Sequence, residues 1–210
     1  MEPLCLILAS NSPRRQEYLG RLGLPFAIRV VAVEEAGRPG EPPEALVARL
    51  ARAKAEAVPL GEGEVVIAAD TVVVLAGEVL GKPAGPDDAR RMLEMLRGRT
   101  HLIHTGVALR RQGDTRVEVV TAQVAMRPYS RPEVEAYVAS GQALDKAGAY
   151  GIQDLPFAPV DHLEGCYMAV VGLPLCHLAR RLLAWKLAVP VLPPEGCRQM
   201  LGRPCTVALF

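Results

Sequence analysis

The chain has 210 residues, of which half are apolar and 22% are charged, and its formal net charge is +1. This length and composition suffice for one folded domain with a substantial core, so neither disulfides nor a structural metal are needed. The small net charge argues against a protein that binds nucleic-acid duplexes, because such proteins make many Lys and Arg contacts with phosphates. We therefore expect a small-molecule ligand that is held in a local pocket.

The cysteines and the N-terminal residues indicate the cellular compartment. The five cysteines are Cys5, Cys166, Cys176, Cys197 and Cys205. Their odd number and the lack of a C-x-x-C pair argue against a disulfide framework and a zinc ribbon. The apolar run Leu4–Ala9 has no basic region before it and is too short for a signal peptide or a membrane span. We expect a cytoplasmic protein that does not bind membranes.

The first third of the chain alternates predicted strands and helices. The apolar run Leu4–Ala9 predicts a strand buried on both faces, and the cap residues and proline after it predict a helix over Pro13–Leu22. Phe26–Val33 has the pattern of a second strand. The polar, Pro- and Gly-rich segment Glu34–Pro43 predicts a loop, and Glu44–Ala57 predicts an alanine-rich helix.

The middle of the chain predicts two hairpins separated by a helix. Glu64–Leu75 is a long β-branched strand that turns into Glu78–Leu80. Pro86–Leu96 is expected to be a helix with acidic residues in its first turn. Thr100–Arg110 and Arg116–Met126 alternate as the two strands of the second hairpin.

The last predicted elements complete an α/β pattern. They are a helix with a capping box at Ser130–Val138, a loop at Gly141–Leu155, a strand at Tyr167–Val171 and a helix at Pro174–Leu187. The pattern predicts a mixed, twisted sheet flanked by helices. We expect one domain over residues 1–188, followed by a Pro-rich tail at residues 189–210.

The segment S-N-S-P-R-R lies where the first predicted strand passes into a helix. Backbone N–H groups and the Ser12 hydroxyl at a helix N-terminus can bind an anion, and Arg14 and Arg15 add bidentate donors. The alternative is a plain N-cap that is followed by two solvated arginines.

Asp70 is the one acid in the apolar strand V-V-I-A-A-D-T-V-V-V-L. A carboxylate there costs free energy unless it meets a cation, a metal ion or a reacting water. We favour a functional acid over one that merely pairs with a core arginine. Thr71 points to the opposite face of a regular strand, or to the same site if the strand has a bulge.

The chain keeps only four lysines beside twenty arginines: Lys54, Lys82, Lys146 and Lys186. A retained lysine is a candidate for a role that needs a compact, flexible ammonium, although chance explains any single one equally well. Gly77–Lys82 resembles a P-loop, but its spacing is one residue short and Pro83 replaces the required Ser or Thr. Lys82 is still able to reach a phosphate from a turn beside the strand of Asp70.

The segment D-K-A-G-A-Y-G-I-Q at residues 145–153 combines glycines with two recognition groups. The glycines permit close backbone approach, while Tyr150 offers a stacking face and Gln153 an amide that can read a base edge. A purely structural turn explains these residue types equally well.

Two other groups of metal-ligand residues are weaker candidates. His101 and His104 are separated by an odd step on a predicted strand, so we do not expect a metal-binding pair. Glu34 and Glu35 precede a loop, where they either bind a divalent cation or are solvated.

Seven motifs, in order from about Leu4 to Leu187, resemble one known family. They are L-A-S-x-S-P-R-R, A-R-x-K-A around Lys54, A-D-T-V-V at Asp70, G-K-P at Lys82, H-T-G-V at His104, D-K-A-G-A-Y-G-I-Q from Asp145, and V-V-G-L-P-L at Val170–Leu175. Together they resemble the Maf family of nucleoside triphosphate pyrophosphatases.

The resemblance implies hydrolysis of a nucleoside triphosphate between its α- and β-phosphates, with a divalent cation (Mg²⁺ or Mn²⁺) as cofactor. The products are a nucleoside monophosphate and pyrophosphate. It also implies a fold like that of inosine triphosphate pyrophosphatases, with two lobes, a central cleft and a homodimeric assembly. The S-P-R-R and D-K-A-G-A-Y-G-I-Q motifs resemble the branch that acts on dTTP and UTP rather than the sister branch that acts on 7-methyl-GTP.

The resemblance also gives roles to individual residues. Asp70 matches the proton acceptor, while Arg14, Thr71 and Gln153 match positions linked to base specificity. The groups expected to bind the triphosphate, which carries about four negative charges, are those of Ser12, Arg14, Arg15, Lys54 and Lys82. Glu35 and Asp70 are the candidates for holding the cation.

Two other functions remain open at this point. One is a nucleotide-binding regulator that does not turn its ligand over, since the family name is tied to septum formation. The other is a phosphatase that releases orthophosphate. The acid at Asp70 favours an enzyme over a regulator, and the identity of the product separates the two enzymes.

Overall fold

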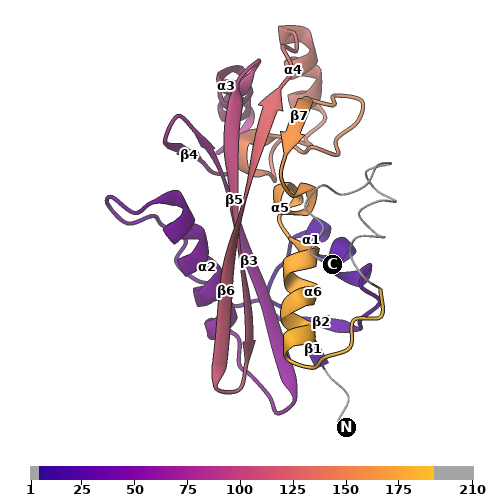
Figure 1. Cartoon of the computed structure of the whole chain (residues 1–210). Helices are drawn as coiled ribbons and strands as arrows, with labels where there is room; N and C mark the ends of the chain where they lie inside the picture. The colour runs from indigo at the N-terminus through magenta and orange to yellow at the C-terminus, as the bar shows by residue number, and fades with distance from the viewer. Residues whose placement is uncertain (1–4, 192–210) are drawn as a thin grey trace. The chain divides into compact units, whose positions relative to one another are not determined.

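A computed structural model describes residues 5–191, which form one mixed sheet and its surrounding helices (Figure 1). The strands are β1 (Cys5–Leu8), β2 (Phe26–Ile28), β3 (Glu64–Leu75), β4 (Glu78–Leu80), β5 (Thr100–Arg111), β6 (Asp114–Met126) and β7 (Val160–Glu164). The helices are α1 (Pro13–Gly20), α2 (Pro43–Ala57), α3 (Pro86–Leu96), α4 (Arg131–Ala139), the 3₁₀ helix η1 (Ala147–Ala149), α5 (Tyr167–Val171) and α6 (Leu175–Ala184). Between residues 5 and 191 no helix has both the length and the apolar character needed to cross a membrane.

The strand order confirms the predicted mixed α/β sheet. The seven strands run in the order β2-β1-β3-β5-β6-β7, and β4 pairs with β3. Strand β1 is parallel to both of its neighbours, whereas the β3–β4 and β6–β7 pairs are antiparallel. Parallel neighbours on both sides explain why β1 is a continuous apolar run without alternation.

The chain divides into two compact units that interleave in the sequence. The first contains the residues up to Asp70, Thr105–Val120 and the residues from Cys166 onward. The second contains Thr71–His104 and Thr121–Gly165. Two units match the two expected lobes, while the central cleft stays a prediction. The proposed division at residues 188 and 189 also stays a prediction, since Leu4 and residues 192–210, with Cys197 and Cys205, lie outside the described residues.

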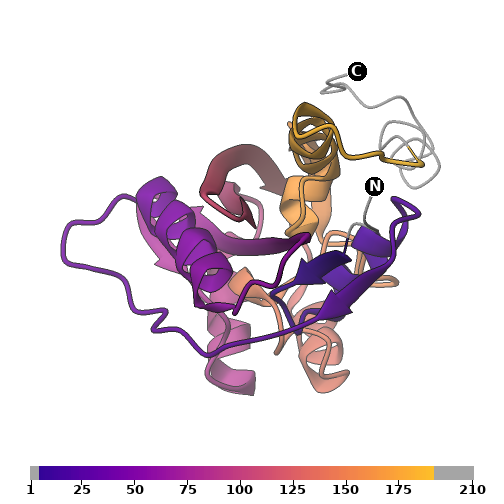
Figure 2. The same ribbon diagram turned by 90° about the horizontal axis from the view of Figure 1, so that it is seen from below.

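In the first unit α2 covers one face of the sheet and α6 covers the other (Figures 1 and 2). The face toward α2 is made of small and β-branched residues that pack against the helix. Its buried cluster consists of Ile7, Val66, Ala68 and Ala108 from the strands, Ala9 just after β1, and Ala51, Ala55 and Val58 from the helix and its end. Because side chains alternate along a strand, Asp70 continues the row of Val66 and Ala68 on the face toward α2.

Helix α2 lies close to the sheet at Gly106 of β5. A Cβ atom on Gly106 would lie 2.4 Å from the carbonyl oxygen of Val47 and 2.7 Å from its carbonyl carbon. Both are backbone atoms, so no side-chain rearrangement can make room for them. Farther along β5, Arg110 donates to the carbonyl oxygens of Glu56 and Val58 at 2.8 and 3.0 Å, which fixes the other end of α2.

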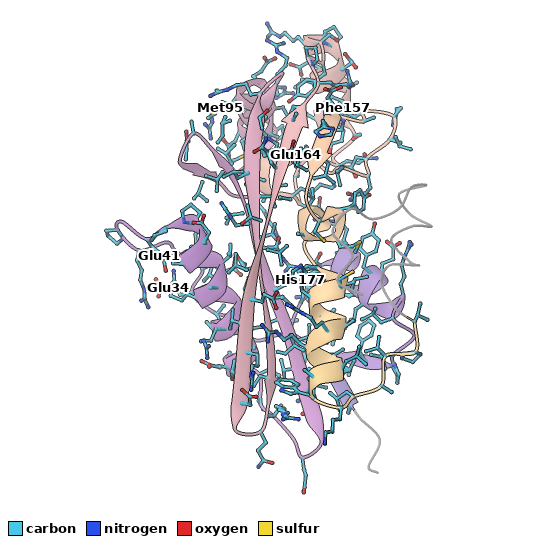
Figure 3. The ribbon with its side chains drawn as sticks, in the orientation of Figure 1. Glu34, Glu41, Met95, Phe157, Glu164 and His177 are labelled. Carbon is cyan, nitrogen blue, oxygen red and sulfur yellow. The ribbon has the colours of Figure 1, made fainter. Side chains whose placement is uncertain are left out.

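Charged side chains fix α6 to the opposite face of the first unit. Glu118 of β6 accepts hydrogen bonds from Arg180 at 2.6 Å and from Arg181 at 3.0 Å. Nδ1 of His177, which Figure 3 labels on α6, lies 2.6 Å from the same carboxylate. The Thr105 hydroxyl donates to a carbonyl of α5 at 2.8 Å. One carboxylate with three partners therefore holds α6 against the sheet.

The second unit is organised by α3, α4 and the loop after them. The predicted capping box of α4 is confirmed, with Ser130 and Glu133 bonding reciprocally. Arg90 of α3 pairs with Glu135 of α4 at 2.7 Å. The Tyr129 hydroxyl donates to a carbonyl of α3 at 2.6 Å, which ties the start of α4 to that helix.

One prediction for the last third of the chain is wrong, and one strand was not predicted. Tyr167–Val171 is not a strand but helix α5, which ends at Gly172 with φ 102° and two capping hydrogen bonds. A five-residue apolar run fits a buried strand or a buried helix equally well, and its β-branched residues favoured the wrong choice. The segment Val160–Glu164 has little apolar alternation, yet it forms β7 by pairing with β6.

Three predicted elements are shorter than expected. Strand β2 stops at Ile28 instead of Val33, because β1 offers partners only over Leu6–Leu8. Helices α1 and α6 end at Gly20 and Ala184, before the predicted ends at Leu22 and Leu187.

Replacing Gly106 with alanine should destabilise the first unit and displace α2. The new Cβ would overlap backbone atoms of Val47, and overpacking of this kind costs on the order of 2–3 kcal/mol. Urea unfolding of Gly106→Ala measures the cost. Gly37→Ala is the matched control, since a Cβ there meets nothing within 4 Å. Equal stability of the two variants would contradict the argument.

Glu64 should make stability pH-dependent in acid. Its carboxylate binds Arg29 through two hydrogen bonds of 2.8 and 2.9 Å, and this contact lowers the pKa of Glu64 to about 2. Because the folded-state pKa lies below the ordinary value of 4.5, the stabilisation is present above that value and is lost as pH falls toward 2. In Glu64→Gln the free energy of unfolding should fall less steeply over this range in urea titrations. A slope equal to that of the unsubstituted protein would refute this role.

Candidate active site

Lys54 and Asp70 form a largely buried ion pair in the first unit. The Lys54 ammonium lies 2.6 Å from Oδ1 of Asp70, and the side chains are 15% and 11% exposed. Lys54 lies seven residues, or about two turns, after Val47 on α2. It therefore lies on the same face of the helix as Val47, which packs against Gly106. The packing of α2 on the sheet therefore brings the cation to the acid. The sequence predicted a partner for Asp70, and the partner is this lysine.

Glu35 joins the same ammonium from the loop before α2. Its Oε1 lies 2.7 Å from the Lys54 nitrogen, and its side chain is 62% exposed. One ammonium thus holds two carboxylates, one buried and one open to solvent. In the same stretch Figure 3 labels Glu34 and Glu41, and Glu41 pairs with Arg49 of α2 at 2.6 Å. That ion pair fixes the loop of Glu35 to the helix of Lys54.

The two carboxylates suit a hard divalent cation. Mg²⁺ binds oxygen ligands and is commonly held by one or two carboxylates together with substrate phosphates. Asp70 and Glu35 supply such oxygens within reach of one lysine. Among residues 5–191 no three His, Cys, Asp or Glu side chains gather around one point. The donor set therefore fits a cation that shares its ligands with a substrate better than a closed structural metal site.

The N-terminus of α1 begins at Ser12, as predicted. Ser12 is the N-cap, and its hydroxyl accepts from the backbone N–H of Arg15 at 3.5 Å. The first turn of α1 contains no acidic residue. A second hydroxyl, from the buried Ser10, accepts from the backbone N–H of Ser12 at 3.2 Å and shapes the turn before the helix. Such an end has the polarity required to bind an anion.

Arg15 also has a structural role that the sequence did not indicate. Its Nε donates to the carbonyl of Gly172 at 2.9 Å, and Nη1 donates to Ser10 at 3.4 Å. Burial lowers the pKa of Arg15, and Asp70 opposes this effect, but a guanidinium stays protonated in proteins. Arg15 therefore links the start of α1 to the end of α5. The half-buried Arg14 belongs to the same turn.

The remaining predicted residues belong to the second unit. Strand β3 continues without interruption past Asp70, which favours the alternative in which Thr71 points to the opposite face. Lys82 is exposed in the bend after β4. The backbone N–H of Gly148 donates to the carbonyl of Gly81 at 3.0 Å, so the G-K-P and D-K-A-G motifs lie together. Gln153 is half-buried in the turn that follows η1.

The predicted residues are thus divided between the units. Ser12, Arg14, Arg15, Glu35, Lys54 and Asp70 belong to the first, and Thr71, Lys82 and Gln153 belong to the second. The assembly of these two groups of residues around one nucleotide stays a prediction.

Comparison with known proteins supplies the family. Residues 5–185 match the family model described as Maf-like protein. The chain belongs to the Maf family. This match spans every element that carries the predicted site.

Curated relatives share about half of their residues with this Maf protein. A protein of Thermus thermophilus named dTTP/UTP pyrophosphatase is 51% identical over 179 residues, which cover 85% of this chain and 94% of the relative. A protein of the same name from Anaeromyxobacter sp. is 48% identical over 204 residues, with 95% of this chain and 98% of the relative covered.

A solved structure of a HAM1 protein from Coxiella burnetii is also similar to this Maf protein. The two chains are 19% identical with a TM-score of 0.46, and the match covers 61% of this chain and 75% of the other.

A double-mutant cycle on Lys54 and Asp70 should reveal strong coupling. Lys54→Met leaves a carboxylate in the sheet without its counter-charge, which should cost about 2–3 kcal/mol, less than a fully buried pair because both groups retain some exposure. Asp70→Asn removes the charge, so the double variant should recover about 1–3 kcal/mol relative to additivity. Urea unfolding of the four proteins gives the coupling energy. Additive effects would show that the contact contributes nothing to the fold.

Proposed function

We propose that this Maf protein hydrolyses dTTP and UTP to the nucleoside monophosphate and pyrophosphate. The observation that carries the proposal is the largely buried Asp70 with Lys54 and Glu35 around it. An acid held inside a sheet by a single lysine is typical of a functional site, because burial is costly and a structural core does not require it. The names of the curated relatives support the substrates.

Cationic and N–H groups are proposed to bind the triphosphate. Ser12 and the N-terminal N–H groups of α1 would receive a phosphate, and Arg14 would add a bidentate contact. Arg15, whose Nε and Nη1 contact Gly172 and Ser10, would add a guanidinium charge beside the phosphate. Lys82, exposed after β4, is proposed as the cation for the far end of the triphosphate.

Asp70 is proposed to direct the attacking water. Oδ1 is engaged by Lys54, which fixes the carboxylate, while Oδ2 takes no part in that pair. A water bonded to Oδ2 would transfer a proton to the carboxylate as its oxygen attacks the α-phosphorus. The bond from that phosphorus to the bridging oxygen then breaks, and its electron pair leaves with pyrophosphate. A divalent cation bound by Glu35 and Asp70 would neutralise charge on the phosphate oxygens.

Base selection is proposed to use Arg14, Thr71 and Gln153. Of these, Gln153 carries an amide, which can donate to one base atom and accept from another.

We also propose a cytoplasmic location, where nucleoside triphosphates are present, and a homodimer. The runner-up functions, a regulator without turnover and an orthophosphate-releasing phosphatase, share the same residues and differ only in what leaves the site.

A turnover assay with dTTP or UTP and Mg²⁺ or Mn²⁺ tests the proposal. Pyrophosphate and the monophosphate should form in equal amounts, and a chelator should abolish the reaction. In Asp70→Asn the rate should fall about 10²–10⁴-fold, the usual contribution of a general base. The control is Asp161→Asn on β7, which changes an exposed acid in the same way.

The alternatives give different results in the same assay. Release of orthophosphate from the triphosphate would identify a phosphatase. Tight nucleotide binding without either product would identify a regulator. Equal activity of Asp70→Asn and Asp161→Asn would remove Asp70 from the mechanism.

A further inference from the structure

One tyrosine hydroxyl closes the turn that carries Gln153. The backbone N–H of Asp154 donates to the carbonyl of Gly151 at 3.1 Å, so Gln153 occupies the third position of a four-residue turn. The Tyr137 hydroxyl from α4 donates to Oδ2 of Asp154 at the end of this turn. The hydroxyl oxygen of Tyr137 also accepts from the backbone N–H of Gly151, at the beginning of the turn, at 3.3 Å. A single group thus bonds both ends.

A buried lysine fixes the Asp154 carboxylate from another side. The Lys146 ammonium lies 3.2 Å from Oδ2 of Asp154, and both side chains are 10% exposed. It also donates to the carbonyl of Gln142 and lies 2.8 Å from Asp145. These contacts join the start of the D-K-A-G-A-Y-G-I-Q motif to Asp154, the residue that follows it.

The carboxylate folds tightly over the first residue of the turn. A Cβ on Gly151 would lie 2.6 Å from Oδ2 of Asp154, so a larger residue would displace the carboxylate from both Tyr137 and Lys146. After the turn, the carbonyl of Asp154 accepts from the N–H of Ala158 at 2.8 Å. The turn is therefore held through the N–H of Gly151, through the carbonyl of Asp154 and through the Asp154 carboxylate.

The hydroxyl is itself held in place. The Tyr137 ring stacks on Phe157, labelled in Figure 3, with a centroid distance of 4.3 Å and an interplanar angle of 16°. Burial raises the pKa of Tyr137, and the Asp154 carboxylate raises it further. The phenol is therefore protonated at neutral pH, which lets it donate to a carboxylate while it accepts from an N–H.

We propose that Tyr137, together with the Lys146–Asp154 pair, is a positioning residue that sets the direction of the Gln153 amide and thereby the choice between bases. This inference rests on the proposed role of Gln153 in base recognition. Uracil and thymine present a carbonyl beside an N–H, whereas cytosine presents an amino group beside an acceptor nitrogen. An amide in one fixed orientation matches only one of these patterns, but a mobile amide can turn and match either.

Removing the hydroxyl should therefore lower selectivity. Tyr137→Phe keeps the ring that stacks on Phe157 and loses only the two hydrogen bonds to the turn. The ratio of kcat/KM for UTP to that for CTP should fall about 10-fold, the size expected for the loss of one well-directed hydrogen bond. For UTP the change should appear mainly in KM, because the residues proposed for water activation are untouched.

Tyr129→Phe is the matched control. The Tyr129 ring also contacts Phe157, at a centroid distance of 5.0 Å, and its hydroxyl also makes a buried hydrogen bond, but to Leu93 of α3. It should lower thermal stability as much as Tyr137→Phe while leaving the UTP to CTP ratio unchanged. Lys146→Met, which loosens Asp154 without changing either tyrosine, should lower the ratio in the same direction as Tyr137→Phe.

Gln153→Ala separates failure of this inference from failure of the proposed function. If it lowers the ratio while both Tyr137→Phe and Lys146→Met leave it unchanged, the positioning role is overturned and Gln153 keeps its role. If Gln153→Ala is active and its UTP to CTP ratio equals that of the unsubstituted protein, the role of Gln153 fails and the inference fails with it. A loss of selectivity in Tyr129→Phe equal to that in Tyr137→Phe would mean that destabilisation alone is responsible, which also overturns the inference.

Discussion

The close approach of α2 to the sheet at Gly106 is the constraint on which the Asp70–Lys54 ion pair of the first unit depends. A carboxylate on a sheet face packed with alanine and valine is unfavourable unless its counter-charge is fixed beside it. The lysine is fixed because α2 lies close to the sheet, and α2 lies close because Gly106 leaves room for the backbone of Val47. Glu35 pairs with the same ammonium from the loop before α2. A packing requirement thus determines the geometry of the charged groups.

Much of the fold could be predicted from local patterns, and the errors share one physical origin. Strand β3 and its hairpin, helix α3 and the α4 capping box depend on residue period and turn chemistry within a few positions. The end of β2 depends instead on where its partner β1 stops, and β7 exists because β6 offers it an edge. For α5 the apolar sequence pattern fits a helix and a strand equally well, and only the surrounding structure decides between them.

The candidate site divides in the same way. Asp70 stood out because it breaks an apolar strand, and Lys54 because lysine is rare in this chain. Their contact could be expected only in general terms, since α2, which carries Lys54, is positioned by non-local packing on the sheet. The bond from Arg15 to Gly172 joins residues 157 positions apart, and no sequence pattern indicated it. The family resemblance, rather than spacing, suggested Thr71 and Gln153.

The two units hold their proposed functional groups with different kinds of interaction. Asp70 is held by an ammonium that also binds the solvent-exposed carboxylate of Glu35, so this network consists of charged groups. Gln153 lies on a turn held by a protonated phenol, a buried lysine and a glycine that admits the carboxylate. A preorganised charge cluster suits charge that changes during a reaction, whereas a turn held at both ends suits recognition of a fixed hydrogen-bonding pattern. Because the described contacts of Asp70 come from the first unit and those that hold the turn of Gln153 come from the second, base selectivity should be able to change by substitution without loss of the hydrolytic groups.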